Sequence, residues 1–191
     1  MMNFWEGIDN ELLGKNYTCG YCGCYVGSEK GYEGIYRTSP EKEVEISIYV
    51  CPSCGNPTYF DKDNRQYPMS KAGNDVLHIN NKDVENLYEE AQNSFSVNAF
   101  TSVVLCCRKL LMNVAVHLGA EENKTFIFYV EWLDKKNYIL PNSKKWVNQI
   151  RKIGNEATHE ICIVSEEDAK KTLIFTEMLL KIVYEFPAMA E

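Results

Sequence analysis

Four cysteines in two short pairs are the residues of this chain best suited to bind a metal. Cys19 and Cys22 form one Cys-x-x-Cys pair, and Cys51 and Cys54 form a second pair after an intervening loop. Four thiolates can surround one Zn²⁺ tetrahedrally, and this spacing is typical of a structural zinc site. The glycine, proline and asparagine residues around both pairs suit tight turns whose N–H groups point at the sulfurs. A site with four protein ligands has no open position for a substrate, so it predicts a folded module and not a reaction.

A second group of polar residues lies in the segment 151–159. Arg151, Asn155 and His159 are spaced i, i+4, i+8, so on a helix they share one narrow stripe. A guanidinium and an amide in a row suit a phosphate, and the imidazole can move a proton near neutral pH. Structural roles are the alternative, with His159 favoured at a helix C-terminus. Gly154 costs about 1 kcal/mol in a helix interior, which indicates a close approach of another backbone or a ligand.

Basic residues are concentrated between positions 135 and 152, although the whole chain has a net charge of −7. This stretch contains no acidic residue, and its side chains are candidate contacts to nucleic acid or to a partner protein: Lys135, Lys136, Lys144, Lys145, Trp146 and Lys152. The acidic total argues against non-specific binding of nucleic acid over the whole surface. A solvated helix face is the alternative interpretation of the basic stretch.

Composition and the first residues indicate the cellular compartment that we expect for the protein. A hydrophobic content of 45% and a charged content of 25% are usual for a folded protein, here one ordinary domain and a small one. The sequence does not open with a basic and apolar leader, and no apolar run approaches the ~20 residues that span a bilayer. Eight cysteines in such a chain are expected as reduced thiols and metal ligands. We therefore expect a cytoplasmic protein that does not act at a membrane.

The N-terminal part predicts a zinc ribbon at residues 15–66. Residues 43–50 alternate polar and apolar and end at Cys51, which indicates a strand that delivers this ligand. The expected partner strands lie at residues 32–37 and 58–60. A module this small buries little apolar surface, so the metal should supply most of its folding free energy, on the order of 10 kcal/mol.

The C-terminal part, residues 82–191, predicts an all-α up-and-down bundle after a linker at residues 67–81, so the expected fold class is α+β. Helical periodicity and start and stop signals predict five helices: from residue 82, at 99–118, at 126–133, at about 141–159, and after Ser165. The second helix is apolar on nearly every face, which is typical of a central helix. Arg108 lies within it and is expected to support the core by pairing with Glu156 or Glu160.

The run Gly154-Asn-Glu-Ala-Thr-His159 resembles the Arg-Asn-x-x-x-His signature of the HEPN superfamily (higher eukaryotes and prokaryotes nucleotide-binding). More closely, Arg151-x-x-Gly-Asn-x-x-x-His resembles an uncharacterised bacterial family of that group, which often follows zinc knuckles and occurs in type I restriction-enzyme subunits. The resemblance implies a HEPN-like bundle and a homodimer, and active members are metal-independent ribonucleases whose site lies between two protomers. Gly154 stands here where those members carry arginine, and Met112 stands where an acid would follow Arg108.

We therefore expect a zinc-containing HEPN-like module that binds nucleic acid or a partner protein, in bacterial or phage defence or counter-defence. One alternative is a metal-independent RNA endonuclease, in which His159 moves a proton and Arg151 stabilises the charged transition state. Another alternative is a non-catalytic adaptor or inhibitor, which the acidic net charge favours. Binding is favoured over catalysis because a glycine replaces the arginine next to Asn155.

Overall fold

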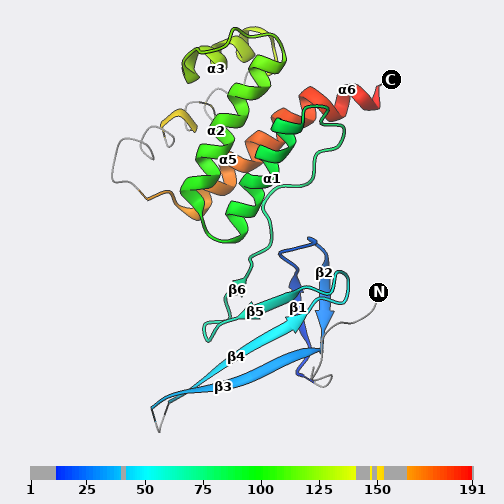
Figure 1. Ribbon diagram of the computed structural model, residues 1–191, viewed down its shortest axis with the longest axis vertical. Helices are drawn as coiled ribbons and strands as arrows, with labels where there is room; N and C mark the ends of the chain where they lie inside the picture. Colours follow the sequence, from blue (N-terminus) through cyan, green and yellow to red (C-terminus); the bar gives the residue numbers. More distant parts are fainter. Residues whose placement is uncertain (1–11, 40–41, 141–146, 148–149, 153–162, 191) are drawn as a thin grey trace. The chain divides into compact units, whose positions relative to one another are not determined.

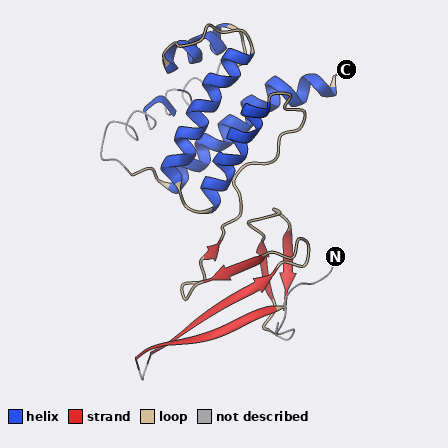
Figure 2. Cartoon of the chain, in the orientation of Figure 1, coloured by secondary structure: helices blue, strands red, loops and turns tan. Residues whose placement is uncertain are grey.

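The computed structural model describes residues 12–39, 42–140, 147, 150–152 and 163–190 (Figure 1). The chain divides into two compact units, residues 1–71 and residues 72–191. The first unit is built from strands and the second from helices, as Figure 2 shows by colour. The fold is therefore mixed, with N-terminal strands and a C-terminal helical region, and the boundary between the units falls within the segment 67–81 that the sequence predicts as a linker.

The first unit contains two antiparallel sheets. They are a hairpin of β1 (Lys15–Thr18) and β2 (Tyr25–Ser28), and a sheet in the order β3 (Gly31–Ser39), β4 (Lys42–Val50), β5 (Pro57–Phe60) and β6 (Gln66–Tyr67). The strands that the sequence predicts correspond to β3, β4 and β5. The loop that follows β4 carries the second cysteine pair, and the turn between β1 and β2 carries the first pair. Two separate hairpin connections therefore deliver the four thiols.

The described part of the second unit consists of helices. They are α1 (Lys82–Ser96), α2 (Phe100–His117), α3 (Phe126–Lys135), α5 (Glu166–Leu180), the π-helical turn η2 (Lys181–Glu185) and α6 (Phe186–Met189). Asn81 caps α1 and Thr125 caps α3, each through a side-chain oxygen that accepts backbone N–H groups. Ser165 caps α5 by accepting the N–H of Asp168, and its hydroxyl donates to the Asp168 carboxylate at 2.8 Å.

Helix α2 is the central helix of this unit, and it packs against α1, α3 and α5. Eight of its residues are buried, which follows from apolar residues on several faces. By length and composition alone α2 could also cross a membrane, a property that core helices of bundles share. The helix ends at Gly119, whose φ of +103° closes a Schellman motif in which Ala120 donates to the Ala115 carbonyl. The predicted helix at 99–118 agrees with α2 to within one residue at each end.

Glu177 of α5 ties the start of the second unit to its helices. Its carboxylate accepts the backbone N–H and the side-chain amide of Asn74 at 2.9 and 3.0 Å, and the ammonium of Lys181 at 2.6 Å. The Tyr88 hydroxyl of α1 donates to the Asn74 carbonyl at 2.7 Å. Burial disfavours the charged carboxylate, but the bonds from Lys181 and Asn74 outweigh burial and lower the pKa of Glu177. No sequence pattern predicted this contact, because its partners are 103 residues apart.

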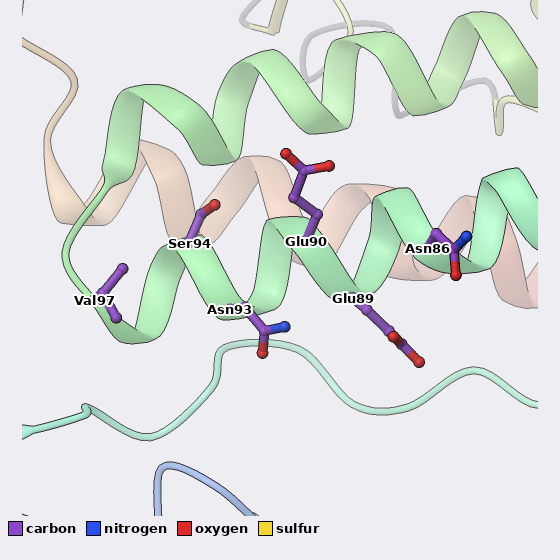
Figure 3. A pocket seen from close by; sticks show the side chains of 6 residues that line it. All are labelled: Asn86, Glu89, Glu90, Asn93, Ser94 and Val97. Atoms are coloured by element: carbon purple, nitrogen blue, oxygen red, sulfur yellow. The ribbon is translucent and has the colours of Figure 1, made fainter.

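A shallow hollow of about 440 Å³ runs along the exposed side of α1 (Figure 3). It is lined by polar and acidic side chains and one valine: Asn86, Glu89, Glu90, Asn93, Ser94 and Val97. Glu89 and Asn93 point to the same side of the helix in Figure 3, since they are one turn apart. The hollow is an open, solvated helix face of the kind that acidic surface helices present.

Candidate metal centre

The two cysteine pairs adopt the same backbone turn. The Cys19 carbonyl accepts the N–H of Gly23 at 2.9 Å, and the Cys51 carbonyl accepts the N–H of Gly55 at 2.8 Å. Both glycines have positive φ, +71° and +75°, which favours glycine over any residue with a side chain. The short spacing and the glycine at the fourth position after each first cysteine thus fix the turn locally. Each turn brings the two sulfurs of its pair to one side.

The four sulfur atoms converge on a common centre. The Sγ atoms of Cys19, Cys22, Cys51 and Cys54 all lie within 4.8 Å of one another. Cys19 and Cys54 are 3.7 Å apart, and Cys22 and Cys51 are 3.8 Å apart. A tetrahedral Zn²⁺ with bonds of about 2.3 Å requires sulfurs separated by about 3.8 Å. The residues therefore fit a four-thiolate metal site, and the separations are too long for disulfides, whose S–S bonds are about 2.05 Å.

The electrostatics of the cluster favour a cation at its centre. Burial raises the pKa of the Cys19 thiol to about 12 and also raises the pKa of Cys51. Cys54 is half-buried, and hydrogen bonds from the backbone and the side chain of Asn56 outweigh this partial burial and lower the pKa of its thiol. Four neighbouring thiolates are unfavourable without a compensating charge. A divalent ion would supply that charge and hold all four thiols deprotonated.

Groups around the sulfurs hold the ligands in place. The backbone N–H of Tyr21 donates to the Cys19 sulfur at 3.4 Å, and the Asn56 amide donates to the Cys54 sulfur at 3.5 Å. A Cβ atom on Gly20 would lie 2.4 Å from the Met69 carbonyl oxygen, so this position requires glycine. The first turn thus packs directly against the backbone that follows β6.

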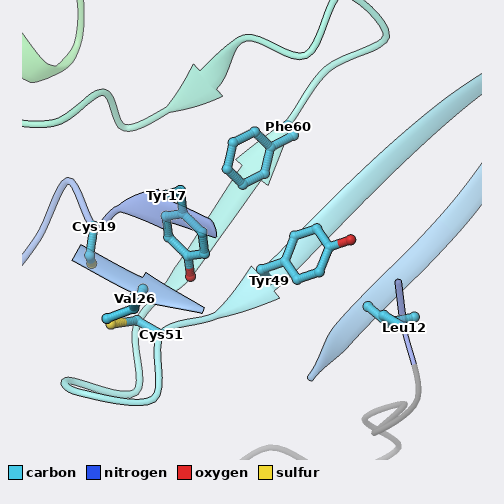
Figure 4. Packing of buried hydrophobic residues seen from close by; sticks show 7 residues of the cluster. All are labelled: Leu12, Tyr17, Cys19, Val26, Tyr49, Cys51 and Phe60. Atoms are coloured by element: carbon cyan, nitrogen blue, oxygen red, sulfur yellow. The ribbon is translucent and has the colours of Figure 1, made fainter. Parts of the chain in front are cut away.

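Two of the four ligands, Cys19 and Cys51, belong to the buried core of the first unit. Cys19 and Cys51 belong to the same cluster of buried residues as the rings of Tyr17, Tyr49 and Phe60, which Figure 4 draws together. The Phe60 ring is 5.4 Å from that of Tyr17 and 5.9 Å from that of Tyr49, each in an edge-to-face arrangement. This core contains few residues, so metal binding and packing depend on each other.

A fifth cysteine, Cys24, lies beside the centre without belonging to it. Its side chain is exposed, and the Ser53 hydroxyl donates to its sulfur at 3.5 Å. The cluster of four thiols that lie within 4.8 Å of one another does not include Cys24.

The comparison with known families concerns the second unit. The model of a family described as a domain of unknown function, DUF4145, matches residues 89–191, more than half of the chain. The chain belongs to this family. No curated protein and no solved structure matches the sequence.

Within the DUF4145 region, the structure exposes four of the cations that the sequence singles out. Lys135 ends α3 and Lys136 follows it, with the Lys136 ammonium 5.7 Å from the centre of the Trp132 ring. Arg151 and Lys152 are exposed and helical, and Ile150 beside them is 1% exposed. These four residues therefore present positive charge to solvent from the DUF4145 region.

Other candidate residues of the DUF4145 region fall outside the described residues. They are Lys144, Lys145, Trp146, Gly154, Asn155 and His159, together with the two acids predicted to pair with Arg108. Arg108 itself is half-buried, with its guanidinium 4.4 Å from the centre of the Phe126 ring. This cation–π contact joins α2 to the start of α3, and burial lowers the pKa of Arg108. Spacing along a helix could not have predicted it, because Phe126 lies on another helix.

Proposed function

We propose that this DUF4145 protein is a cytoplasmic, zinc-containing interaction module with a HEPN-like helical region, and that it binds nucleic acid. The exposed cations at positions 135, 136, 151 and 152 carry the proposal, because phosphate contacts by Lys and Arg dominate affinity for nucleic acid. The spacing of Arg151, Asn155 and His159, which resembles the HEPN signature, supports the HEPN-like assignment. A role in bacterial or phage defence or counter-defence is part of the proposal, on the same resemblance.

Zinc is the metal that the donor set favours. Four clustered thiolates favour Zn²⁺ over Ca²⁺ and Mg²⁺, which prefer oxygen ligands. In this proposal the metal holds the first unit folded, and the basic residues of the helical unit bind the phosphates. The site with four protein ligands leaves no position for a substrate.

Reversing the basic charge should weaken binding strongly. The triple change Lys135→Glu, Lys136→Glu and Lys152→Glu should reduce affinity for a dye-labelled RNA strand at least about 10-fold, because the variant neutralises fewer phosphates. Its affinity should also depend less steeply on salt, since fewer counterions are released on binding. Fluorescence anisotropy at two salt concentrations measures both effects. Lys170→Glu, a change at an exposed lysine of α5, is the control and should leave affinity nearly unchanged. Equal reductions in both variants would contradict the proposed binding surface.

The ribonuclease alternative is tested through His159. If the protein binds without cleaving, His159→Ala should leave nucleic-acid affinity within about 2-fold of wild type, since a single neutral side chain contributes little to phosphate attraction. Cleavage of single-stranded RNA without added metal, abolished by His159→Ala, would replace the proposed function with catalysis. A gel assay of labelled RNA distinguishes the two outcomes.

A homodimer is the oligomeric state that the HEPN resemblance implies. Light scattering at micromolar concentration should give about twice the chain mass of 22.0 kDa. Most soluble oligomers are symmetric dimers, so a discrete doubling is expected and not a distribution of sizes. A single 22.0 kDa species across the concentration range would remove the dimer from the proposal.

A further inference from the structure

One face of the four-stranded sheet carries a row of aromatic and aliphatic side chains. In the strand register, Tyr32 of β3 is opposite Ile48 of β4, Ile48 is opposite Tyr59 of β5, and Tyr59 is opposite Tyr67 of β6. Residues opposite each other in antiparallel strands point to the same face. The four side chains therefore form a single line across the sheet, which we call the tyrosine row.

The tyrosine row lies on the face of the sheet opposite the buried cluster around the cysteines. Tyr49 follows Ile48 on β4, and Phe60 follows Tyr59 on β5, so Tyr49 and Phe60 point to the opposite face. Tyr49 and Phe60 belong to the buried cluster around the cysteines. Tyr59 is 37% exposed, and the other three members of the row are half-buried. Ile48 of β4 thus faces away from that cluster, although a sheet with one solvated face normally carries polar residues there.

Charge is distributed unequally between the two faces. Among the described side chains of β3 to β6, Glu33 is the only acidic one, and it lies opposite Ser47, in the register of the core face. Burial and the neighbouring Glu33 raise the pKa of Tyr49, which is consistent with that placement. Lys30 and Arg65 are exposed, and each precedes a tyrosine of the row by two residues.

The Asp61 carboxylate lies at the edge of the tyrosine row, and its oxygens already accept hydrogen bonds. Asp61 accepts the Tyr67 hydroxyl at 3.2 Å and the backbone N–H groups of Asp63 and Arg65 at 2.9 Å each. These donors surround the carboxylate within the β5–β6 turn. The turn thereby orients the Tyr67 ring, whose centre is 5.9 Å from that of Tyr59 with 32° between the planes.

From these observations we infer that the tyrosine row binds single-stranded nucleic acid by stacking its bases. Tyr59 and Tyr67 lie on adjacent strands with ring centres 5.9 Å apart, and Tyr32 lies two strands from Tyr59, so the row offers rings on which successive bases can stack. Base–aromatic stacking stabilises binding at each stacked base and tolerates any sequence, because every base has a flat face. A duplex keeps its bases inside its stack and cannot use such a row.

The inference rests on the proposed function, since it specifies which form of nucleic acid the protein holds. In this inference the two units bind nucleic acid through different interactions. The helical cations attract phosphates and make affinity depend on salt, whereas stacking on tyrosines depends on salt only weakly. The acidic character of the chain therefore opposes the first contribution more than the second.

The test compares full-length variants at Tyr59. Tyr59→Leu keeps an apolar side chain but removes the ring, and it should weaken binding of a short dye-labelled oligouridine by roughly 10-fold while leaving binding of an equally long duplex unchanged. Tyr59→Phe keeps the ring and should remain within about 2-fold of wild type. Tyr25→Leu, at a tyrosine of β2 that is 75% exposed on the other sheet, is the matched control and should have no effect.

The outcomes separate this inference from the proposed function. If the wild-type protein binds RNA and Tyr59→Leu binds it equally well, the tyrosine row does not hold the bases and the inference is overturned alone. If wild type binds neither strand nor duplex, both proposals fail. If Tyr59→Leu changes the mass in light scattering and not the RNA affinity, the row is a protein interface and the inference is overturned. The metal content of each variant shows whether its first unit is folded. If Tyr59→Leu loses its metal, Tyr32→Leu on β3 is tested in its place.

Discussion

Replacing Cys51 and Cys54 together with serine should reduce the metal content of the purified protein from about one equivalent per chain to none. Two remaining thiolates cannot close a tetrahedral site, and the binding free energy of a structural zinc is on the order of 10 kcal/mol. Since the first unit has a small core built around the cysteines, it should unfold when the metal is removed. Elemental analysis measures the metal, and the near-ultraviolet circular dichroism of the buried tyrosines measures the fold.

The matched control for this change is Cys24→Ser. Cys24 is exposed beside the cluster, so its replacement should leave both the metal and the tyrosine signal intact. The helical signal of the second unit should persist in both variants, because the two units are separate compact bodies. Full metal content in the double variant would show that the ligands are assigned wrongly. Iron in place of zinc would leave the ligand assignment unchanged, since tetrahedral thiolates also suit iron.

The convergence of the four thiols could be predicted because its causes are local. A Cys-x-x-Cys pair followed by a glycine able to take positive φ determines its own turn, and the same turn occurs twice. Strand β4 was equally accessible to prediction, since nine residues are enough to show a period of two. Strands β1, β2 and β6 were not predicted, because four residues or fewer show no clear period. Strand β5 is equally short, but its consecutive β-favouring residues Thr58, Tyr59 and Phe60 made it accessible.

The orientation of β4 shows that an alternating pattern does not predict which face of a strand is buried. The pattern divides the strand into two sets of residues, and packing decides which set faces the core. Here Tyr49 of the more polar set covers the cysteines, while Ile48 of the apolar set joins the outer row. Likewise the last helical segment continues its apolar pattern through residues 181–185, where the backbone widens into a π-helical turn that the side-chain pattern does not encode.

Glu177→Gln should reduce the free energy of unfolding of the helical unit by about 2–3 kcal/mol, because it removes a charged acceptor that holds Asn74 and Lys181. The Glu177 side chain is 10% exposed, so water cannot fully replace these bonds. Urea unfolding followed by the helical circular dichroism signal measures the change. Glu167→Gln is the matched control on the same helix, since Glu167 pairs with Lys171 at the same i, i+4 spacing but is 76% exposed. Its effect should stay within about 0.5 kcal/mol.

The stabilisation that Glu177 contributes should decrease as the pH falls. Its folded pKa lies below the ordinary value of about 4.3, so its contribution is complete above that pH and is lost as the pH falls through the folded pKa. Glutamine does not titrate. The difference between wild type and Glu177→Gln should therefore be constant near neutral pH and should shrink in acid. A difference that stays constant down to pH ~3 would mean that the charge of Glu177 contributes nothing and that its shape alone stabilises the fold.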